Sequence, residues 1–137
     1  MTTKEPIWVR DETALAIHGR QIAEHGGSEG VRDRGLLESA RARPKNLFAY
    51  SSPKASTVIS LPQLAASYAH GIAKNHPFVD GNKRTAFVVC ELFLRLNDHS
   101  ISATAEEKYL AFLSLAEGTL SEEKFAAWIQ EHLRSRP

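Results

Sequence analysis

The chain has one cysteine and almost no net charge, and each of these features excludes some classes of protein. The single cysteine, Cys90, excludes an internal disulfide and is typical of a reducing compartment, so we expect a cytoplasmic protein. Seventeen lysines and arginines are balanced by sixteen aspartates and glutamates, which leaves a formal charge of +1. This balance provides no general attraction for nucleic acid or for an anionic membrane, and neither is an expected partner.

Long apolar runs and the common nucleotide-binding loops are missing as well. No apolar run approaches the roughly 20 residues that span a bilayer, and the polar residues 1–12 contain no signal-peptide core. There is no Gly-Lys-Ser/Thr phosphate loop and no kinase-type glycine-rich loop, so a nucleotide would have to bind through another architecture. The six histidines form no pair with metal-ligand spacing, which makes a zinc site unexpected. The length of 137 residues and the lack of repeats predict a single domain over residues 1–137.

Apolar residues at helical spacing predict an all-α bundle of about five or six helices. Asp11 is the predicted N-cap of the first helix, and Gly26–Gly27 is its predicted end. Asp33 is expected to cap a short second helix, which Pro44 ends because the residue before a proline is disfavoured in the helical region. Pro62 fits the first turn of a third helix.

The third helix is followed by a strongly apolar segment. Pro77 biases His76 to an extended conformation, so the third helix should stop just before it. The next helix starts at Asn82 or Lys83 and is apolar around much of its circumference, which is typical of a central, buried helix. Two further helices are predicted, at residues 105–118 and after a cap at Ser121.

Residues 44–60 lack helical periodicity and are predicted to form a long loop. Loops of this length in a compact domain are usually functional or mobile. Residues 56–60 alternate enough to form one strand of a small hairpin. Because the loop leads into the helix that delivers His76, we expect it to act as a flap over that residue, with a plain surface connector as the alternative.

The stretch HPFVDGNKRTAF, residues 76–87, places two cations at the start of a helix. The first helical turn carries unpaired N–H groups and a partial positive charge, so each cation there costs about 0.3–1 kcal/mol unless an anion lies opposite. Gly81 lets the backbone turn tightly and gather successive N–H groups into an anion-binding nest. The nest, the helix dipole, Lys83 and Arg84 all direct positive potential at one point, which predicts a bound phosphate. For residues 80–82 alone, an ordinary turn with an asparagine cap is the alternative.

Three other side chains of this stretch can be given roles. His76 is the side chain in the loop that can take a proton near neutral pH, which favours a general base acting on a substrate hydroxyl over a structural histidine. Asp80 offers a hard oxygen ligand beside the phosphate, the arrangement in which Mg²⁺ is usually held. Phe78 is expected to point into the core and to anchor the loop.

With these residues the chain resembles the Fic/Doc superfamily, and within it the death-on-curing (Doc) toxins. The family signature is His-x-Phe-x-Asp/Glu-Gly-Asn followed by a basic segment. It is matched by His76, Phe78, Asp80, Gly81 and Asn82, and then by Lys83-Arg84-Thr85-Ala86. Residues 26–44 and 65–78 look like Doc segments too, and the resemblance covers roughly residues 15–130.

The resemblance implies a Fic-type helical bundle with a small flap before the motif-bearing helix pair. It implies ATP as the nucleotide substrate and Mg²⁺ as the cofactor, with His76 as the base, Asp80 as the metal ligand, and Gly81, Asn82, Lys83 and Arg84 on the phosphates. Doc toxins phosphorylate a threonine of elongation factor Tu, which stops translation, and a cognate antitoxin holds them inactive. The flap would dock the target polypeptide by strand-like pairing.

Two departures bear on the activity. Fic proteins that transfer AMP carry Gly and then Arg after the motif Asn, and a second Arg three residues on. This chain has Lys83 and Phe87 at the first and last of these positions, as Doc does, which favours phosphate transfer and leaves AMP transfer as the alternative. A Ser/Thr-x-x-x-Glu-Gly/Asn inhibitory segment is missing, because Glu117-Gly118 is preceded by Leu113, so inhibition should come from another chain. A third reading is a toxin that binds nucleic acid or the ribosome without nucleotide chemistry, and a fourth is a catalytically silent binding module.

Overall fold

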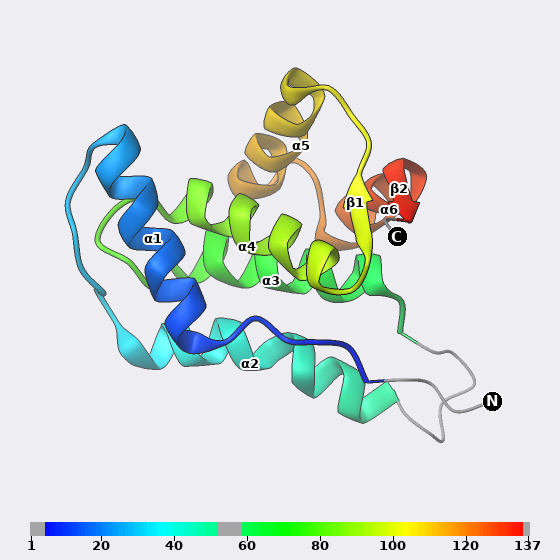
Figure 1. Ribbon diagram of the computed structural model, residues 1–137, viewed down its shortest axis with the longest axis horizontal. Coiled ribbons are helices and arrows are strands. Elements are labelled where there is room, and N and C mark those ends of the chain that lie inside the picture. Colours follow the sequence, from blue (N-terminus) through cyan, green and yellow to red (C-terminus); the bar gives the residue numbers. More distant parts are fainter. Residues whose placement is uncertain (1–4, 52–58, 136–137) are drawn as a thin grey trace.

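The computed structural model describes residues 5–51 and 59–135, and these contain six helices and one small sheet (Figure 1). In chain order the elements are α1 (Asp11–His25), α2 (Arg34–Ser51), α3 (Leu61–Asn75), α4 (Asn82–Leu96), β1 (His99–Ile101), α5 (Ala105–Glu117), α6 (Glu122–His132) and β2 (Leu133–Ser135). Each strand has three residues. The prediction of an all-α bundle is therefore confirmed. None of the described helices is long and apolar enough to cross a membrane.

The centre of the bundle is the pair α3 and α4, which lie side by side and are joined by the short loop of residues 76–81 (Figure 1). Small residues let α3 approach its neighbours closely, since a Cβ added at Gly71 would lie only 3.2 Å from the Cα of Ala40 in α2. α4 buries Cys90 and Phe93 completely. Its predicted central position is confirmed, and the loop at its start is held by the two most enclosed helices.

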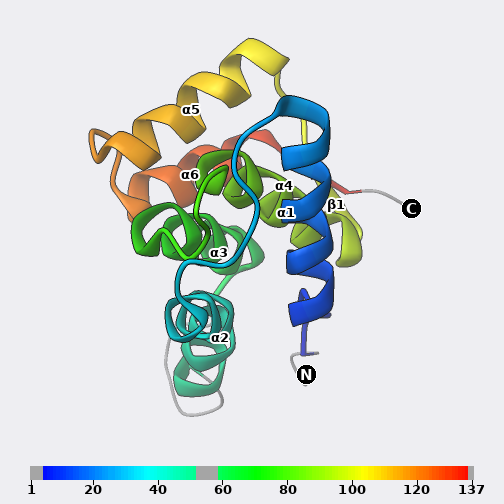
Figure 2. The same cartoon turned by 90° about the vertical axis from the view of Figure 1, so that its left-hand side faces the viewer.

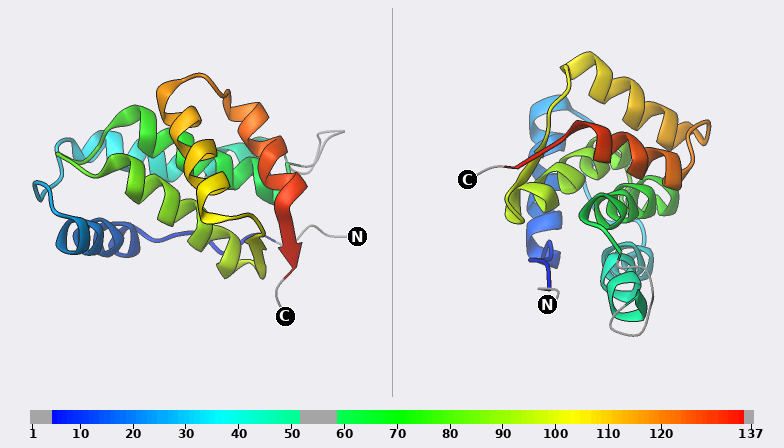
Figure 3. Two further views of the ribbon diagram at one scale, coloured as in Figure 1. Left: turned by 90° about the horizontal axis from the view of Figure 1, so that it is seen from above. Right: turned by 90° about the vertical axis from the view of Figure 1, so that its right-hand side faces the viewer.

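The other helices cover this pair from several sides. α2 packs along α3 and α1 packs against α4, while α5 and α6 lie over the side of the pair away from α2 (Figures 2 and 3). The sheet pairs β1 with β2 in antiparallel register and joins the end of α4 to the end of α6. The segment between α1 and α2 passes across the end of the bundle where α3 and α4 are joined (Figure 2).

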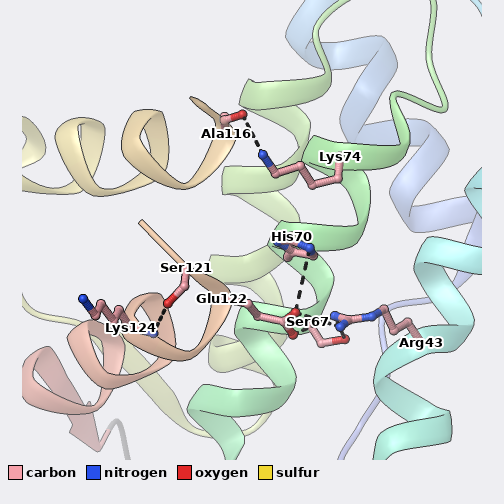
Figure 4. Close-up of polar contacts among 8 residues, drawn as sticks. All are labelled: Arg43, Ser67, His70, Lys74, Ala116, Ser121, Glu122 and Lys124. Atoms are coloured by element: carbon pink, nitrogen blue, oxygen red, sulfur yellow. Dashed lines mark hydrogen bonds and ion pairs between the residues drawn. The ribbon is translucent and has the colours of Figure 1, made fainter. Parts of the chain in front are cut away.

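A partly buried polar cluster ties α2 and α6 together across α3 (Figure 4). Arg43 of α2 donates hydrogen bonds of 2.6 and 2.7 Å to the two carboxylate oxygens of Glu122 in α6, and one of 3.1 Å to Ser67 Oγ in α3. His70 of α3 lies 3.9 Å from the same carboxylate, and burial lowers the pKa of its imidazole. The cluster fixes the outer helices against the helix that precedes the loop.

The first helix boundary differs from the prediction. Asp11 is not the N-cap of α1 but its first residue, and the N-cap is Arg10, which makes no side-chain capping bond. The Asp11 carboxylate instead lies 3.6 Å from the guanidinium of Arg41 in α2. A charged partner on another helix has replaced the local capping interaction that the sequence pattern indicates.

Pro44 does not end its helix either, because α2 continues through it to Ser51. A proline inside a helix removes one hydrogen bond of the ladder and crowds the preceding turn. Pro44 is buried, however, on the same helical face as Leu37 and Ala40, the face that packs against α3. Packing along the whole of this face offsets the lost bond, and residues 44–51 are helical instead of a loop.

The remaining predicted caps are present. Gly26 closes α1 with φ at 80°, and Pro62 occupies the first turn of α3. Asp33 Oδ1 accepts a 3.0 Å hydrogen bond from the Leu36 N–H, and Ser121 Oγ accepts one of 3.1 Å from the Lys124 N–H.

Residues 52–58 of the predicted flap lie outside the described residues. The described end of the expected strand, Ile59 and Ser60, is not in a strand, and Ser60 instead caps α3. In the described part of the chain, the sheet follows the motif loop rather than preceding it.

Candidate active site

His76 ends α3 in a left-handed conformation, with φ at 49° and ψ at 55°. The prediction of an extended His76 is therefore wrong. A helix that stops and reverses direction commonly places its first non-helical residue in this region, usually a glycine. A residue with a Cβ pays about 1–3 kcal/mol for such a conformation and keeps it only when neighbouring groups hold it there. The side chain of His76 is exposed.

The loop after His76 is closed by the side chain of Asn82. Its Oδ1 accepts a 3.0 Å hydrogen bond from the Phe78 N–H, and its Nδ2 donates one of 3.0 Å to the Phe78 carbonyl. Phe78 is buried and stacks on the His18 ring of α1 with centroids 3.8 Å apart, so its predicted position in the core is confirmed. Because the Asn82 amide is used inside the loop, the group that it leaves for a phosphate is its backbone N–H.

Gly81 stands at φ 75°, a left-handed conformation that favours glycine, and an added Cβ would also press on Ile22 Cδ1 at 3.1 Å. The first intrahelical bond of α4 runs from the Thr85 N–H to the Gly81 carbonyl. The N–H groups that precede it in the first turn have no helical partner and carry the positive end of the helix dipole. Unpaired N–H groups at a helix start can bind an anion, and the predicted phosphate site stays a prediction.

Asp80 is held by its backbone neighbours and by the segment between α1 and α2. Its Oδ1 accepts from the Gly81 N–H at 2.8 Å and its Oδ2 accepts from the Ser28 N–H at 3.3 Å. The segment between α1 and α2 comes so close to Asp80 that a Cβ added at Gly27 would lie 2.6 Å from Asp80 Oδ2. The Asp80 carbonyl lies 2.7 Å from His18 Nε2. The carboxylate therefore has a fixed direction while it stays exposed.

Most residues of the motif loop and of the start of α4 line one cleft of about 740 Å³, a volume typical of small-ligand sites. Its polar wall is formed by His76, Asp80, Gly81, Asn82, Lys83 and Arg84. Its apolar wall is formed by Phe87, Val88, Tyr109, Phe112 and Leu113 of α4 and α5, and Gln21 and His25 of α1 also line it. All of the predicted site residues except the buried Phe78 thus meet at one cavity.

The donor set of the cleft fits a magnesium ion that is held mainly by substrate. Within the described residues, no group of three or more histidine, cysteine, aspartate or glutamate side chains could form a metal cage. Asp80 provides a fixed, exposed carboxylate beside the anion site. Mg²⁺ is commonly bound by one or two carboxylates together with phosphate oxygens and water, which matches a single carboxylate here.

Sequence reasoning assigns no site role to two residues that support the site, His18 and Gly27. Gly27 enters it only as part of the predicted end of the first helix. Both contact the motif loop across more than fifty residues of sequence. Spacing within a helix or a turn carries no information on such contacts. The quoted likeness of residues 26–44 to Doc segments was the one signal that this region matters.

Comparisons with known proteins agree with the all-α fold and identify the family. The Fic/DOC family model matches residues 8–94, and the chain belongs to this family. A relative described as "Protein kinase doc", from Escherichia phage P1, is 34% identical over 89 residues, which are 65% of this chain and 67% of the relative. A second, "Toxin Doc" from Mycolicibacterium smegmatis, is 40% identical over 81 residues, 57% of each protein. The matches thus span between about half and two thirds of these relatives.

Proposed function

We propose that this chain is a Doc-type toxin that transfers the γ-phosphate of ATP to a threonine or serine hydroxyl of a translation factor. The main observation behind this proposal is that His76, Asp80 and the cationic start of α4 line the same cleft. The name of the phage relative, a protein kinase, supports this activity, and the name of the mycobacterial relative supports the role of toxin.

His76 is the general base of the proposed reaction. Its exposed side chain lines the cleft beside the anion site, where a substrate hydroxyl can reach it. As the hydroxyl oxygen bonds to the γ-phosphorus, its proton passes to the neutral imidazole. The bond from the γ-phosphorus to the oxygen bridging to the β-phosphate breaks, and ADP leaves with that electron pair. The N–H groups at the start of α4, with Lys83 and Arg84, hold the transferred group and its charge.

Asp80 would hold Mg²⁺, which when bound neutralises charge on the phosphate oxygens. The hydrogen bonds from the Gly81 and Ser28 N–H groups orient this carboxylate before a ligand arrives. They also disperse its negative charge, so that it repels an incoming nucleotide less.

The apolar wall of the cleft favours phosphate transfer over AMP transfer. Phe87 stacks on Phe112 with ring centroids 4.1 Å apart and lies in the cleft wall. An apolar ring at this position cannot hold the outer phosphates that an arginine would grip in an AMP transferase. Lys83 adds bulk and charge at the start of α4, where AMP-transferring relatives have glycine. Both differences favour a nucleotide bound with its γ-phosphate in the nest at Gly81.

Elongation factor Tu is the proposed target, and a cognate antitoxin is the proposed inhibitor. Both follow from membership of the Doc group rather than from a surface of this chain. The lack of an inhibitory Ser/Thr-x-x-x-Glu segment in the sequence agrees with control by a second protein.

The proposal is tested by incubating purified chain and elongation factor Tu with ATP labelled at either the α- or the γ-phosphate. We expect label from the γ-position only, and a mass gain of one phosphate on the factor. A gain of AMP would replace the proposal by nucleotidylation, and no modification of any bacterial protein would reject an enzymatic function. His76→Ala, purified in parallel, controls for a contaminating kinase. Growth arrest by the chain alone, relieved by co-expression of a small neighbouring reading frame, tests the antitoxin.

A further inference from the structure

Arg32 contacts three successive carbonyl groups at the point where α3 ends. Its Nε donates a 2.7 Å hydrogen bond to the His76 carbonyl, and its Nη2 donates one of 2.8 Å to the Asn75 carbonyl. Its backbone N–H donates a third, of 2.7 Å, to the Pro77 carbonyl. These bonds span more than forty residues of sequence and join the α1–α2 segment to the backbone of the motif loop.

Two of the three carbonyls, those of Asn75 and His76, lie at the end of α3, where the helix itself supplies no donor. The Pro77 carbonyl also accepts a 3.0 Å hydrogen bond from the Asp33 N–H. The last carbonyls of a helix have no intrahelical partner and carry its negative dipole end, which a cation stabilises. The chain turns away at His76 in the left-handed region, so the next N–H groups cannot continue the ladder. The planar guanidinium presents two parallel N–H groups, and these match two adjacent carbonyls in a way that a lysine ammonium does not.

The contact acts on the backbone of His76 and not on the cleft. Arg32 is not among the residues that line the cleft. The Nε and Nη2 edge of its guanidinium donates to the carbonyls of His76 and Asn75. Neighbouring bonds extend the same attachment, because the Asp33 N–H also donates to the Pro77 carbonyl and the Val79 N–H donates to the Gly30 carbonyl. The direction of the His76 Cα–Cβ bond, from which the imidazole extends, follows from the backbone conformation that these contacts hold.

We propose that Arg32 is a positioning residue for His76: it holds the base in a left-handed backbone conformation that aims the imidazole into the cleft. This inference rests on the proposed role of His76 as the base. Arg32 itself touches neither nucleotide nor target.

The test compares Arg32→Gln and Arg32→Lys with the wild type and with Arg34→Gln. Arg34, two residues further on, is exposed and lies 4.0 Å from its nearest carboxylate, so it serves as a matched control. Steady-state phosphate transfer gives kcat and the KM for ATP. Because a misplacement of about 1 Å can cost about a hundredfold in rate, we expect kcat to fall about 10- to 100-fold in Arg32→Gln with little change in KM. Arg32→Lys should recover part of the loss, and Arg34→Gln should match the wild type.

A double-mutant cycle separates positioning from a general loss of fold. If Arg32 acts through His76, adding Arg32→Gln to His76→Ala should lower the residual rate no further. An equal, additive loss in both backgrounds would overturn the proposal, and so would a wild-type kcat in Arg32→Gln.

A readout without turnover keeps this inference separate from the proposed function. The ¹³Cα and ¹³Cβ NMR shifts of His76 report its backbone conformation in the free protein. We expect them to move in both Arg32 variants and to stay in place in Arg34→Gln. Unchanged shifts in a folded Arg32→Gln would overturn the inference even if the wild type proves to be an active kinase. Moved shifts in a chain that transfers no phosphate would keep the positioning contact while rejecting the proposed function.

Discussion

Replacing Asn82 with alanine should cost the protein about 2–4 kcal/mol of its free energy of unfolding. The substitution removes both hydrogen bonds that the side chain makes with Phe78 and leaves a backbone N–H and a carbonyl without partners next to a buried ring. Each orphaned buried group costs about 1–3 kcal/mol, and access of water from the exposed neighbours Val79 and Asp80 lowers the upper limit. A domain of ordinary stability, about 5–15 kcal/mol, would remain folded after this loss.

Urea denaturation and calorimetric titration with ATP analogues measure the two consequences separately. We expect a lower denaturation midpoint and weaker nucleotide binding in Asn82→Ala, because the loop that shapes the nest becomes disordered. Asn97→Ala is the control: its amide bonds the backbone of Ile7 and Phe93, far along the chain from the motif. That variant should lose stability and keep its affinity. An Asn82→Ala protein as stable as the wild type but unable to bind nucleotide would refute the reasoning and make the amide a phosphate ligand.

Four further changes have defined outcomes. His76→Ala should fold normally and lose about 10²–10⁴-fold in transfer rate, since its side chain is exposed and its role is proton transfer; a wild-type rate would remove it as the base. Asp80→Asn should abolish the stimulation of transfer by Mg²⁺ in a magnesium titration; a stimulation that survives would assign the metal to another group. Gly27→Ala should weaken activity, because its Cβ would meet Asp80 Oδ2 at 2.6 Å on a backbone at φ 119°; crystallography or NMR of the variant would show a displaced Asp80. Burial lowers the pKa of His70, so the unfolded chain binds a proton first as the pH falls below about 6.5, and stability should drop there; urea midpoints in wild type and His70→Gln would show whether that slope is reduced.

The parts of the structure that the sequence predicted are those with local causes. The start of α4 after Gly81, the cap at Asp33 and the end of α1 at Gly26 depend on residues within one helical turn. The clustering of His76 and Asp80 with the two cations follows from their position in one short loop. Local chemistry decides these features, and a sequence displays it directly.

The errors arise where a distant segment competes with a local preference. Pro44 remains helical because its face packs on α3, and Asp11 turns from the cap position toward Arg41 of another helix. His76 takes a left-handed conformation in spite of the following proline because Arg32 satisfies the carbonyls around it. Each of these contacts joins segments that lie many helical turns apart in the sequence. The spacing of apolar residues and the residue preferences of turns do not report which distant segments will contact each other.

The cationic start of α4 has a consequence for the stability of the empty protein. Among the described residues, Lys83 and Arg84 are in no ion pair, and they lie exposed beside each other on the positive end of a helix dipole. Both charges oppose the positive end of that dipole, so the ligand-free state is held below the stability that neutral residues would give it. Binding of phosphate groups should therefore raise the melting temperature, and added salt should weaken nucleotide affinity by screening the same charges. At the proposed phosphate site, the fold thus gives up stability that a bound anion would restore.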